Sequence, residues 1–253
     1  MGHFIAITGK GGVGKTTISA LIVNRLIKRG RVPVLAIDAD PNTCLDAMLG
    51  VKAEKTVGRV REEAREVAGQ GMAAGVSKQE LLEMKISESL IEAKDFDLIA
   101  MGRSEGPGCY CYANNVLKAV ISEISVNYPY IVLDNEAGLE NLSRRIVQEV
   151  DVLIIVSDPS NRGLETVKRL YELSHEMGIV YKKLILIVNR NRKDHLPESA
   201  NELQKASNAD ILINLPDDSE LIELSEKSQV ISELSDNNPT IKKIDELLEK
   251  LEL

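Results

Sequence analysis

The sequence is poor in the residues that mark several classes of protein. Its 253 residues include no Trp, two Phe and three Cys. Three cysteines are too few and too unevenly spaced for the disulfide framework of a small secreted protein. The longest aliphatic runs, such as residues 152–156 and 184–188, are five residues long, whereas a membrane-spanning helix needs about 20. The sequence therefore predicts a protein that is neither built on disulfides nor embedded in a membrane.

Basic residues are outnumbered by acidic ones. The chain has 31 Lys and Arg against 39 Asp and Glu, which gives a formal net charge of −8. This charge argues against a protein that binds nucleic acid mainly by neutralising phosphates. A secretory signal peptide is a basic segment followed by an apolar one, and we do not expect one here, because residues 1–8 already lead into the first expected strand. We therefore expect a cytoplasmic protein with no nucleic-acid and no membrane partner.

Apolar segments alternate with helical patterns through most of the chain. Strands are expected at residues 4–8, 34–37, 98–101, 131–133, 152–156, 184–188 and 211–215. Helices are expected at residues 16–29, 116–124, 139–150, 163–177 and 197–207. Continuous apolar strands are typical of parallel sheets buried on both faces. The pattern predicts an α/β fold in which one domain, residues 1–253, has a mostly parallel sheet with helices on both faces.

Residues 51–95 interrupt this rhythm. Their charges follow a helical pattern around a Gly- and Ala-rich break at residues 69–75, and they contain no clear strand. We interpret them as a helical excursion on the flank of the sheet. The alternative is a mobile element that faces a partner.

The C-terminal residues predict one more helix. Ile241, Ile244, Leu247 and Leu248 recur at helical spacing, with Lys and Glu between them. A helix on a membrane surface usually has a basic polar face, whereas this one mixes both signs of charge. We expect the helix to pack on the core.

A glycine-rich segment between the first expected strand and helix carries the strongest functional signal. It reads GKGGVGKTT from Gly9 to Thr17, which fits the phosphate-loop pattern of Gly, four residues, Gly, Lys and Ser or Thr. Glycine lets successive N–H groups turn toward a phosphate, and the following helix adds its positive end. Lys15 is expected to neutralise phosphate charge, and Thr16 to offer its hydroxyl to Mg²⁺. The predicted nucleotide-binding residues of the loop are Gly11, Gly12, Val13, Gly14, Lys15, Thr16 and Thr17.

Polar side chains follow several of the expected strands. Asp38 and Asp40 end the second strand, Asp134 follows residues 131–133, and Asn189 follows residues 184–188. Open α/β sheets bind ligands at the carboxyl ends of their strands. Asp38 and Asp134 are therefore candidate Mg²⁺ partners. The Asn189 amide offers a donor and an acceptor to a base edge. The alternatives are strand-end capping for the aspartates and an ordinary turn for Asn189.

Cys109 and Cys111 are two residues apart in a Gly-rich segment. Two thiolates supply half of a four-coordinate metal site, and no third Cys or His lies near them in sequence. A symmetric dimer would double the pair, and four thiolates suit Zn²⁺ or Ni²⁺. The alternative is two ordinary cysteines. Cys44, on an expected helix, is interpreted as a small core residue.

Together these motifs resemble the CooC-type maturation ATPases of nickel carbon monoxide dehydrogenase and the related acetyl-CoA synthase. The CooC-type ATPases belong to the deviant Walker A class of phosphate-loop NTPases, as do nitrogenase iron protein and the Min and Par ATPases. The resemblance is carried by Lys10 in the loop, Asp-Ala-Asp-Pro at 38–41, MGRSEGPGCYCY at 101–112 and DNEAGLE at 134–140. It implies a Mg²⁺-dependent ATPase with ATP, Mg²⁺ and Ni²⁺, Zn²⁺ being possible instead of nickel. It also implies a homodimer that inserts nickel into one of those client enzymes.

The resemblance also assigns roles to single residues. Cys109 and Cys111 match the metal ligands shared across the dimer. Lys10, Lys15 and Asp40 match the catalytic residues: Lys10 reaches the nucleotide of the partner subunit, and Asp40 orients the attacking water. Pro216 and Asp217 match the adenine-recognition segment. Without the resemblance, Lys10 is readable as a solvated cation.

Two other functions use the same loop. An iron–sulfur ATPase reductase needs a cysteine shortly after its second switch, which residues 134–138 resemble here, and residues 138–150 contain none. A positioning ATPase of the Min or Par type needs a basic DNA-binding patch or a membrane helix, neither of which this charge pattern favours. A GTPase is disfavoured because the candidate base-contact run reads Asn-Arg-Asn-Arg at 189–192 rather than Asn-Lys-x-Asp.

Overall fold

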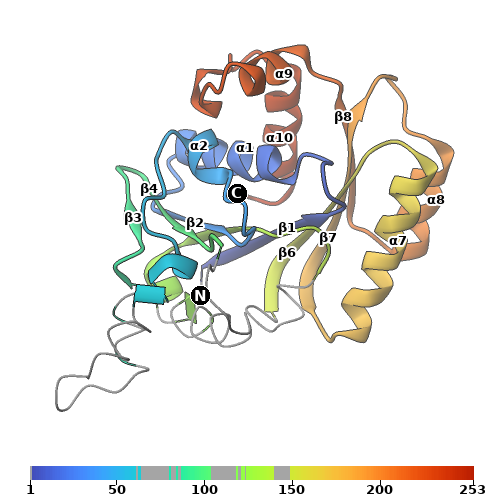
Figure 1. Cartoon of the computed structure of the whole chain (residues 1–253). Helices are drawn as coiled ribbons and strands as arrows, with labels where there is room; N and C mark the ends of the chain where they lie inside the picture. The colour runs from blue at the N-terminus through green and yellow to red at the C-terminus, as the bar shows by residue number, and fades with distance from the viewer. Residues whose placement is uncertain are drawn as a thin grey trace.

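The computed structural model describes residues 2–60, 62–63, 80, 84, 87–103, 118, 121–122, 124–139 and 149–253. Figure 1 shows a sheet with helices on its two faces. The strands are β1 (His3–Gly9), β2 (Val34–Asp38), β3 (Ile91–Glu92), β4 (Phe96–Ala100), β5 (Tyr130–Asp134), β6 (Glu149–Ser157), β7 (Val180–Asn191) and β8 (Ile211–Pro216). The α-helices are α1 (Lys15–Lys28), α2 (Leu45–Leu49), α7 (Asn161–Glu176), α8 (Glu198–Ser207), α9 (Ser219–Glu226) and α10 (Pro239–Lys250), with 3₁₀ turns η1 (Ser125–Asn127) and η2 (Ile231–Glu233).

The strand order is β3-β4-β2-β5-β1-β6-β7-β8, so β1 lies in the interior of the sheet. Neighbouring strands are parallel except β3, which pairs antiparallel with β4. The expected mostly parallel α/β fold is confirmed.

Two sequence predictions are wrong at element boundaries. Residues 51–95 were expected to hold no strand, but β3 lies there. It has only two residues and a tight reversal, in which the Ala93 N–H donates to Phe96 O at 3.0 Å, so it leaves no apolar run to detect. The helix expected at 139–150 gives way to β6 at Glu149, which pairs with Val180 of β7. Much of the helix expected at 116–124 lies outside the described residues.

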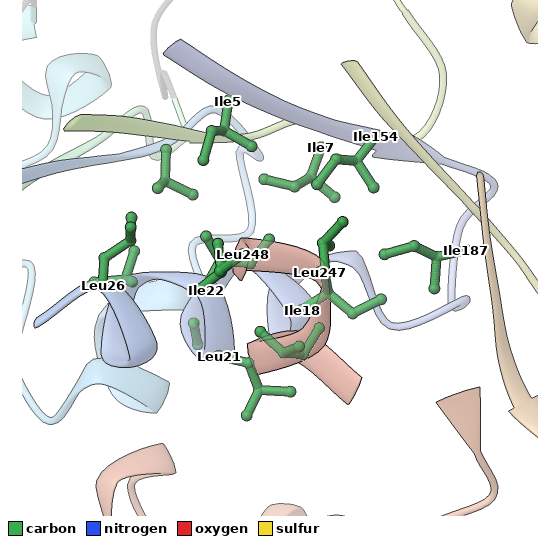
Figure 2. Packing of buried hydrophobic residues seen from close by; sticks show 14 of the residues in the cluster. Ile5, Ile7, Ile18, Leu21, Ile22, Leu26, Ile154, Ile187, Leu247 and Leu248 are labelled. Carbon is green, nitrogen blue, oxygen red and sulfur yellow. The ribbon is translucent and has the colours of Figure 1, made fainter. Parts of the chain in front are cut away.

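The core has two layers, one on each face of the sheet. Side chains alternate along β1, because successive strand residues point to opposite faces. Ile5 and Ile7 belong to the cluster with α1 and α10, and Phe4 and Ala6 to the cluster with α7 and α8. Figure 2 shows the first cluster, with Ile18 and Ile22 of α1 under the sheet. Helices on both faces, as expected, hold the central strands in place.

The C-terminal helix packs on the core, as predicted. Leu247 and Leu248 of α10 are fully buried against α1 (Figure 2). Arg25 of α1 donates from Nε to Asp245 Oδ1 of α10 at 2.9 Å, and this contact fixes the two helices at their solvent side. Among the described helices, none combines the length and the apolar character needed to cross a membrane.

Candidate functional site

The glycine-rich loop leaves the carboxyl end of β1 and enters α1. Gly12 and Gly14 have φ of 79° and 94°, a region that disfavours residues with a Cβ. A Cβ on Gly14 would also lie 2.5 Å from Asn189 Nδ2, and one on Gly9 2.3 Å from Val156 O. The glycines therefore satisfy both the conformation of the loop and its close contacts with β6 and β7.

The carbonyl groups of this loop are held by groups around it. The contacts are Gly138 N–H to Gly9 O at 3.1 Å, Lys15 Nζ to Lys10 O at 3.2 Å, Arg190 Nη1 to Gly12 O at 3.1 Å and Asn189 Nδ2 to Val13 O at 2.8 Å. The backbone N–H groups of residues 11–14, in contrast, donate to no group within the described part of the chain. A run of N–H groups without acceptors is a ready site for an anion.

Lys15 brings a positive charge to the loop. Its side chain is buried, and burial lowers the pKa of its ammonium, while the charges of Asp134, Asp40 and Glu136 raise it. The ammonium donates to Lys10 O. A carbonyl group carries no net charge, so the hydrogen bond to it leaves the positive charge of Lys15 available to neutralise a phosphate.

Asp134 lies at the end of β5, opposite Asp38 of β2 in register. Its carboxylate is buried, Oδ1 accepts from Ser19 Oγ at 3.1 Å, and Oδ2 has no hydrogen-bond partner among the described residues. Burial raises the pKa of Asp134 to about 7, and Asp38 adds to this, while the Thr16 and Ser19 hydroxyls and Lys15 oppose it. An unpartnered buried oxygen beside a threonine hydroxyl fits the hard, oxygen-only ligand set of Mg²⁺.

Asp38 is fully buried and bound to the backbone of the segment after β2. Its carboxylate accepts the N–H groups of Asp40 at 3.0 Å, Cys44 at 2.9 Å and Leu45 at 3.0 Å. Burial raises the pKa of Asp38, and these three N–H groups oppose that effect. Asp40 is half-buried, and its Oδ1 accepts from the Asn42 N–H at 2.8 Å. The Asp38 carboxylate thus caps the backbone of this segment, as the alternative interpretation expected, and a contact between Asp38 and Mg²⁺ stays a prediction.

A cavity of about 240 Å³ lies beside the start of α1. Its wall includes four predicted nucleotide-binding residues, Thr17, Asn189, Pro216 and Asp217. The Asn189 amide nitrogen already donates a hydrogen bond to Val13 O, which leaves the amide oxygen free to accept one from a ligand. The expected base-binding residues therefore meet in one place, next to the phosphate loop.

Comparison with known proteins identifies the family. The family described as AAA domain matches residues 2–186. The chain belongs to this AAA domain family. It is 40% identical over 248 residues to an uncharacterized ATP-binding protein of Methanocaldococcus jannaschii, covering 98% of this chain and 97% of that one. It is 31% identical over 227 residues to the carbon monoxide dehydrogenase accessory protein CooC of Rhodospirillum rubrum, covering 85% of this chain and 84% of that one.

Solved structures show the same fold. The cell division ATPase MinD of Pyrococcus furiosus is similar with a TM-score of 0.71 at 20% identity, covering 100% of this chain and 99% of that one. A MinD from Pyrococcus horikoshii, solved with Mg-ADP, gives a TM-score of 0.71 at 21% identity, covering 99% and 96%. This AAA domain thus has the MinD/ParA-like P-loop fold.

The sequence missed part of the wall of the cavity beside α1. Arg190, Leu221 and Ile222 also line it, and Ile222 is 46% exposed. The signal available was the amphipathic pattern of α9, which directly follows the Pro216-Asp217 segment. Arg190 lies in the candidate base-contact run at 189–192, but its contact with the loop had no signal, because only the folded chain brings it there.

The three cysteines were predicted to have two different roles. Cys44 was expected in the core of the AAA domain, but its side chain is exposed. The prediction was wrong because Cys44 precedes α2 rather than lying within it, so that its backbone N–H, not its thiol, faces Asp38. Cys109 and Cys111 lie outside the described residues. Among those that are described, no group of three or more His, Cys, Asp or Glu is arranged to hold a metal ion.

Lys10 lies on the exposed outer side of the loop. Burial raises the pKa of Asp158. The hydrogen bonds of Ser160 and the charge of Lys10 lower this pKa by more, so that the net shift is downward. Lys10 therefore lies near Asp158, just before α7, and its role toward a partner subunit stays a prediction.

Proposed function

We propose that this protein is a Mg²⁺-dependent ATPase that hydrolyses ATP to ADP and phosphate. The observation that carries the proposal is the loop whose N–H groups at residues 11–14 have no acceptor in the described part of the chain, next to the buried Lys15 ammonium. Both are arranged for the negative charge of a polyphosphate.

The other residues have distinct tasks in this proposal. Thr16 and Asp134 would hold the Mg²⁺ ion, with Asp38 near a bound water, and the ion would neutralise charge on the phosphates. Asp40 orients a water whose oxygen bonds to the γ-phosphorus, while the bond from that phosphorus to the bridging oxygen of ADP breaks. Lys15 stabilises the negative charge that gathers on the leaving oxygens.

Two substitutions test the ATPase proposal. Lys15→Ala should abolish phosphate release. Asp40→Ala should retain ATP binding and lose hydrolysis, because the water is no longer oriented. Asp194→Ala, an exposed carboxylate at the rim of a neighbouring groove, is the matched control and should keep wild-type turnover. Hydrolysis by Asp40→Ala at the wild-type rate would refute the role of Asp40.

We further propose a maturation function in which a homodimer carries Ni²⁺ to a carbon monoxide dehydrogenase or acetyl-CoA synthase. Support comes from the 31% identity to the carbon monoxide dehydrogenase accessory protein CooC. In this proposal Cys109 and Cys111 of two subunits bind one Ni²⁺ or Zn²⁺ as cargo, and Lys10 reaches the nucleotide of the partner subunit. Opening the dimer would halve the ligand count and release the metal.

Metal binding and assembly test this second proposal. Metal analysis and sedimentation should give one metal ion per dimer, lost in Cys109→Ser and in Cys111→Ser, with Cys44→Ser as the matched control that retains it. Lys10→Ala should weaken ATP-dependent dimerisation. One metal ion per monomer, or nickel binding that survives either substitution, would exclude the shared site.

A further inference from the structure

Two consecutive residues at the end of β7 contact the phosphate loop from outside. Asn189 Nδ2 donates to Val13 O at 2.8 Å, and Arg190 Nη1 donates to Gly12 O at 3.1 Å. These are the carbonyl groups of two consecutive loop residues. The two side chains therefore hold two adjacent peptide groups.

A held carbonyl group also orients an N–H group. In a trans peptide the C=O and the following N–H are coplanar and point in opposite directions. Fixing Gly12 O on one side directs the Val13 N–H to the other side. In the same way, fixing Val13 O directs the Gly14 N–H away from Asn189.

We propose that Asn189 and Arg190 are positioning residues that preset the Val13 and Gly14 N–H groups for phosphate before any nucleotide binds. The inference rests on the proposed ATPase function and adds a role for β7 in it. Gly12 is the residue that most needs such support. Its φ of 79° is one that glycine adopts readily, and glycine has the greatest conformational freedom of any residue, so a contact is needed to fix it.

The backbone of β7 is irregular where these residues occur. Val188 pairs with Asn214 and Asn191 with Pro216, so β7 carries one extra residue between these pairs. Arg190 has φ of 56°, which is uncommon for a residue with a side chain. In a regular strand, consecutive side chains point to opposite faces. The extra residue and the left-handed backbone together allow both side chains to reach the same loop, as bulges near functional sites do.

The left-handed backbone makes a sharp test possible. Arg190→Gly removes the guanidinium and suits the positive φ, so the melting temperature should not fall. Amide hydrogen exchange of the loop peptide, residues 9–15, should become faster in the nucleotide-free protein. Asn208→Gly, at φ of 51° at the end of α8, is the matched control and should leave this exchange unchanged. Arg190→Lys keeps a donor and should restore much of the protection.

Nucleotide titrations complete the test. Arg190→Gly should weaken ATP and ADP binding by similar factors of about tenfold, since both phosphate chains use the preset N–H groups. Unchanged loop exchange in Arg190→Gly would overturn the proposal even if affinity fell, because a direct contact with the nucleotide would then explain the loss. Wild-type protein that hydrolyses no ATP would refute the ATPase function, yet it would leave the exchange result of the nucleotide-free protein valid.

Discussion

The carboxylate of Asp134 is an unfavourable group in the metal-free protein. Burial raises its pKa from an ordinary 3.8 to about 7, and Oδ2 has no hydrogen-bond partner in the described part of the chain. The folded protein therefore holds this proton more tightly than the unfolded chain does. The contribution to stability is complete below a pH of about 4 and declines as the pH rises to about 7. A bound cation would offset the unfavourable charge.

Asp134→Asn should for this reason stabilise the metal-free protein in a pH-dependent way. In the presence of a chelator we expect a higher melting temperature at pH 8, where the buried carboxylate is ionised. The change at pH 5 should be small, because Asp134 is then protonated and resembles the neutral amide. Thermal unfolding at the two pH values measures both changes. Equal shifts at pH 5 and pH 8 would contradict the raised pKa, and Asp194→Asn, at an exposed site, should have little effect at either pH.

Among single residues, the sequence located those that local spacing brings together, and their roles stay predictions. The loop from Gly9 to Thr17 forms one short motif, so its structure follows from its own residues. The contact of Arg190 with Gly12 joins residues that are far apart in sequence, and the bulge that permits it leaves no pattern. Cys44 was misplaced because helix propensity does not settle where a short helix such as α2 begins.

Among the elements, α9 and α10 share one buried junction. Asp218 Oδ1 accepts the N–H groups of Glu220 at 3.0 Å and Leu221 at 3.3 Å, which caps α9. Its Oδ2 accepts from Thr240 Oγ1 in the first turn of α10 at 2.6 Å. Because Leu221 lines the cavity beside α1, this junction fixes one wall of that cavity.

Asp218→Ala should affect both stability and ligand affinity. Loss of the cap and of the Thr240 contact should lower the free energy of unfolding by about 1–3 kcal/mol. Weaker ATP binding should accompany it, because the wall formed by α9 is less well fixed. Ser160→Ala removes the cap of α7, a contact with the Gly163 N–H, and should cost about 1 kcal/mol without changing affinity. Urea unfolding and nucleotide titration measure the two effects, and equal effects of both variants on affinity would contradict the role of α9.

Elements with a clear apolar pattern were predictable, including the short strands β2, β5 and β8, whereas β3, α9 and the outer residues of β7 were not. The helices α1 and α7 lie within two residues of their expected ends, since apolar spacing sets which face packs on the sheet. The strand β3 and the start of β6 are decided instead by pairing with β4 and β7. Pairing partners are distant in sequence, so their effect on a boundary has no local signature.

For the molecule as a whole, strand order is the part that the sequence left open. Alternation of strands and helices predicted a parallel sheet, yet many orders satisfy that pattern. Only the folded chain places β1 between β5 and β6, where the phosphate loop meets residues from β5, β6 and β7. The convergence of Asp134 and Asn189 on the loop is a product of that order.

The packing of α10 on α1 connects the end of the chain to the helix that follows the phosphate loop. Leu247→Ala, at a fully buried site, should lower the free energy of unfolding by about 2–5 kcal/mol, because it leaves a cavity between the helices and the sheet. Lys242→Ala, on the exposed side of the same helix, should change it by less than about 0.5 kcal/mol. Urea unfolding distinguishes these outcomes, and a loss below about 1 kcal/mol for Leu247→Ala would contradict a core role for α10.

The half-exposed Ile222 at the cavity wall has a spectroscopic consequence. The chain contains no Trp, so its intrinsic emission comes from tyrosine alone. Ile222→Trp would place a single indole fluorophore at the mouth of the cavity, against an otherwise dark background at long wavelengths. Stacking of a nucleobase on that ring should quench its emission and shift its maximum. Ligand entry could thus be followed in real time by light from one side chain.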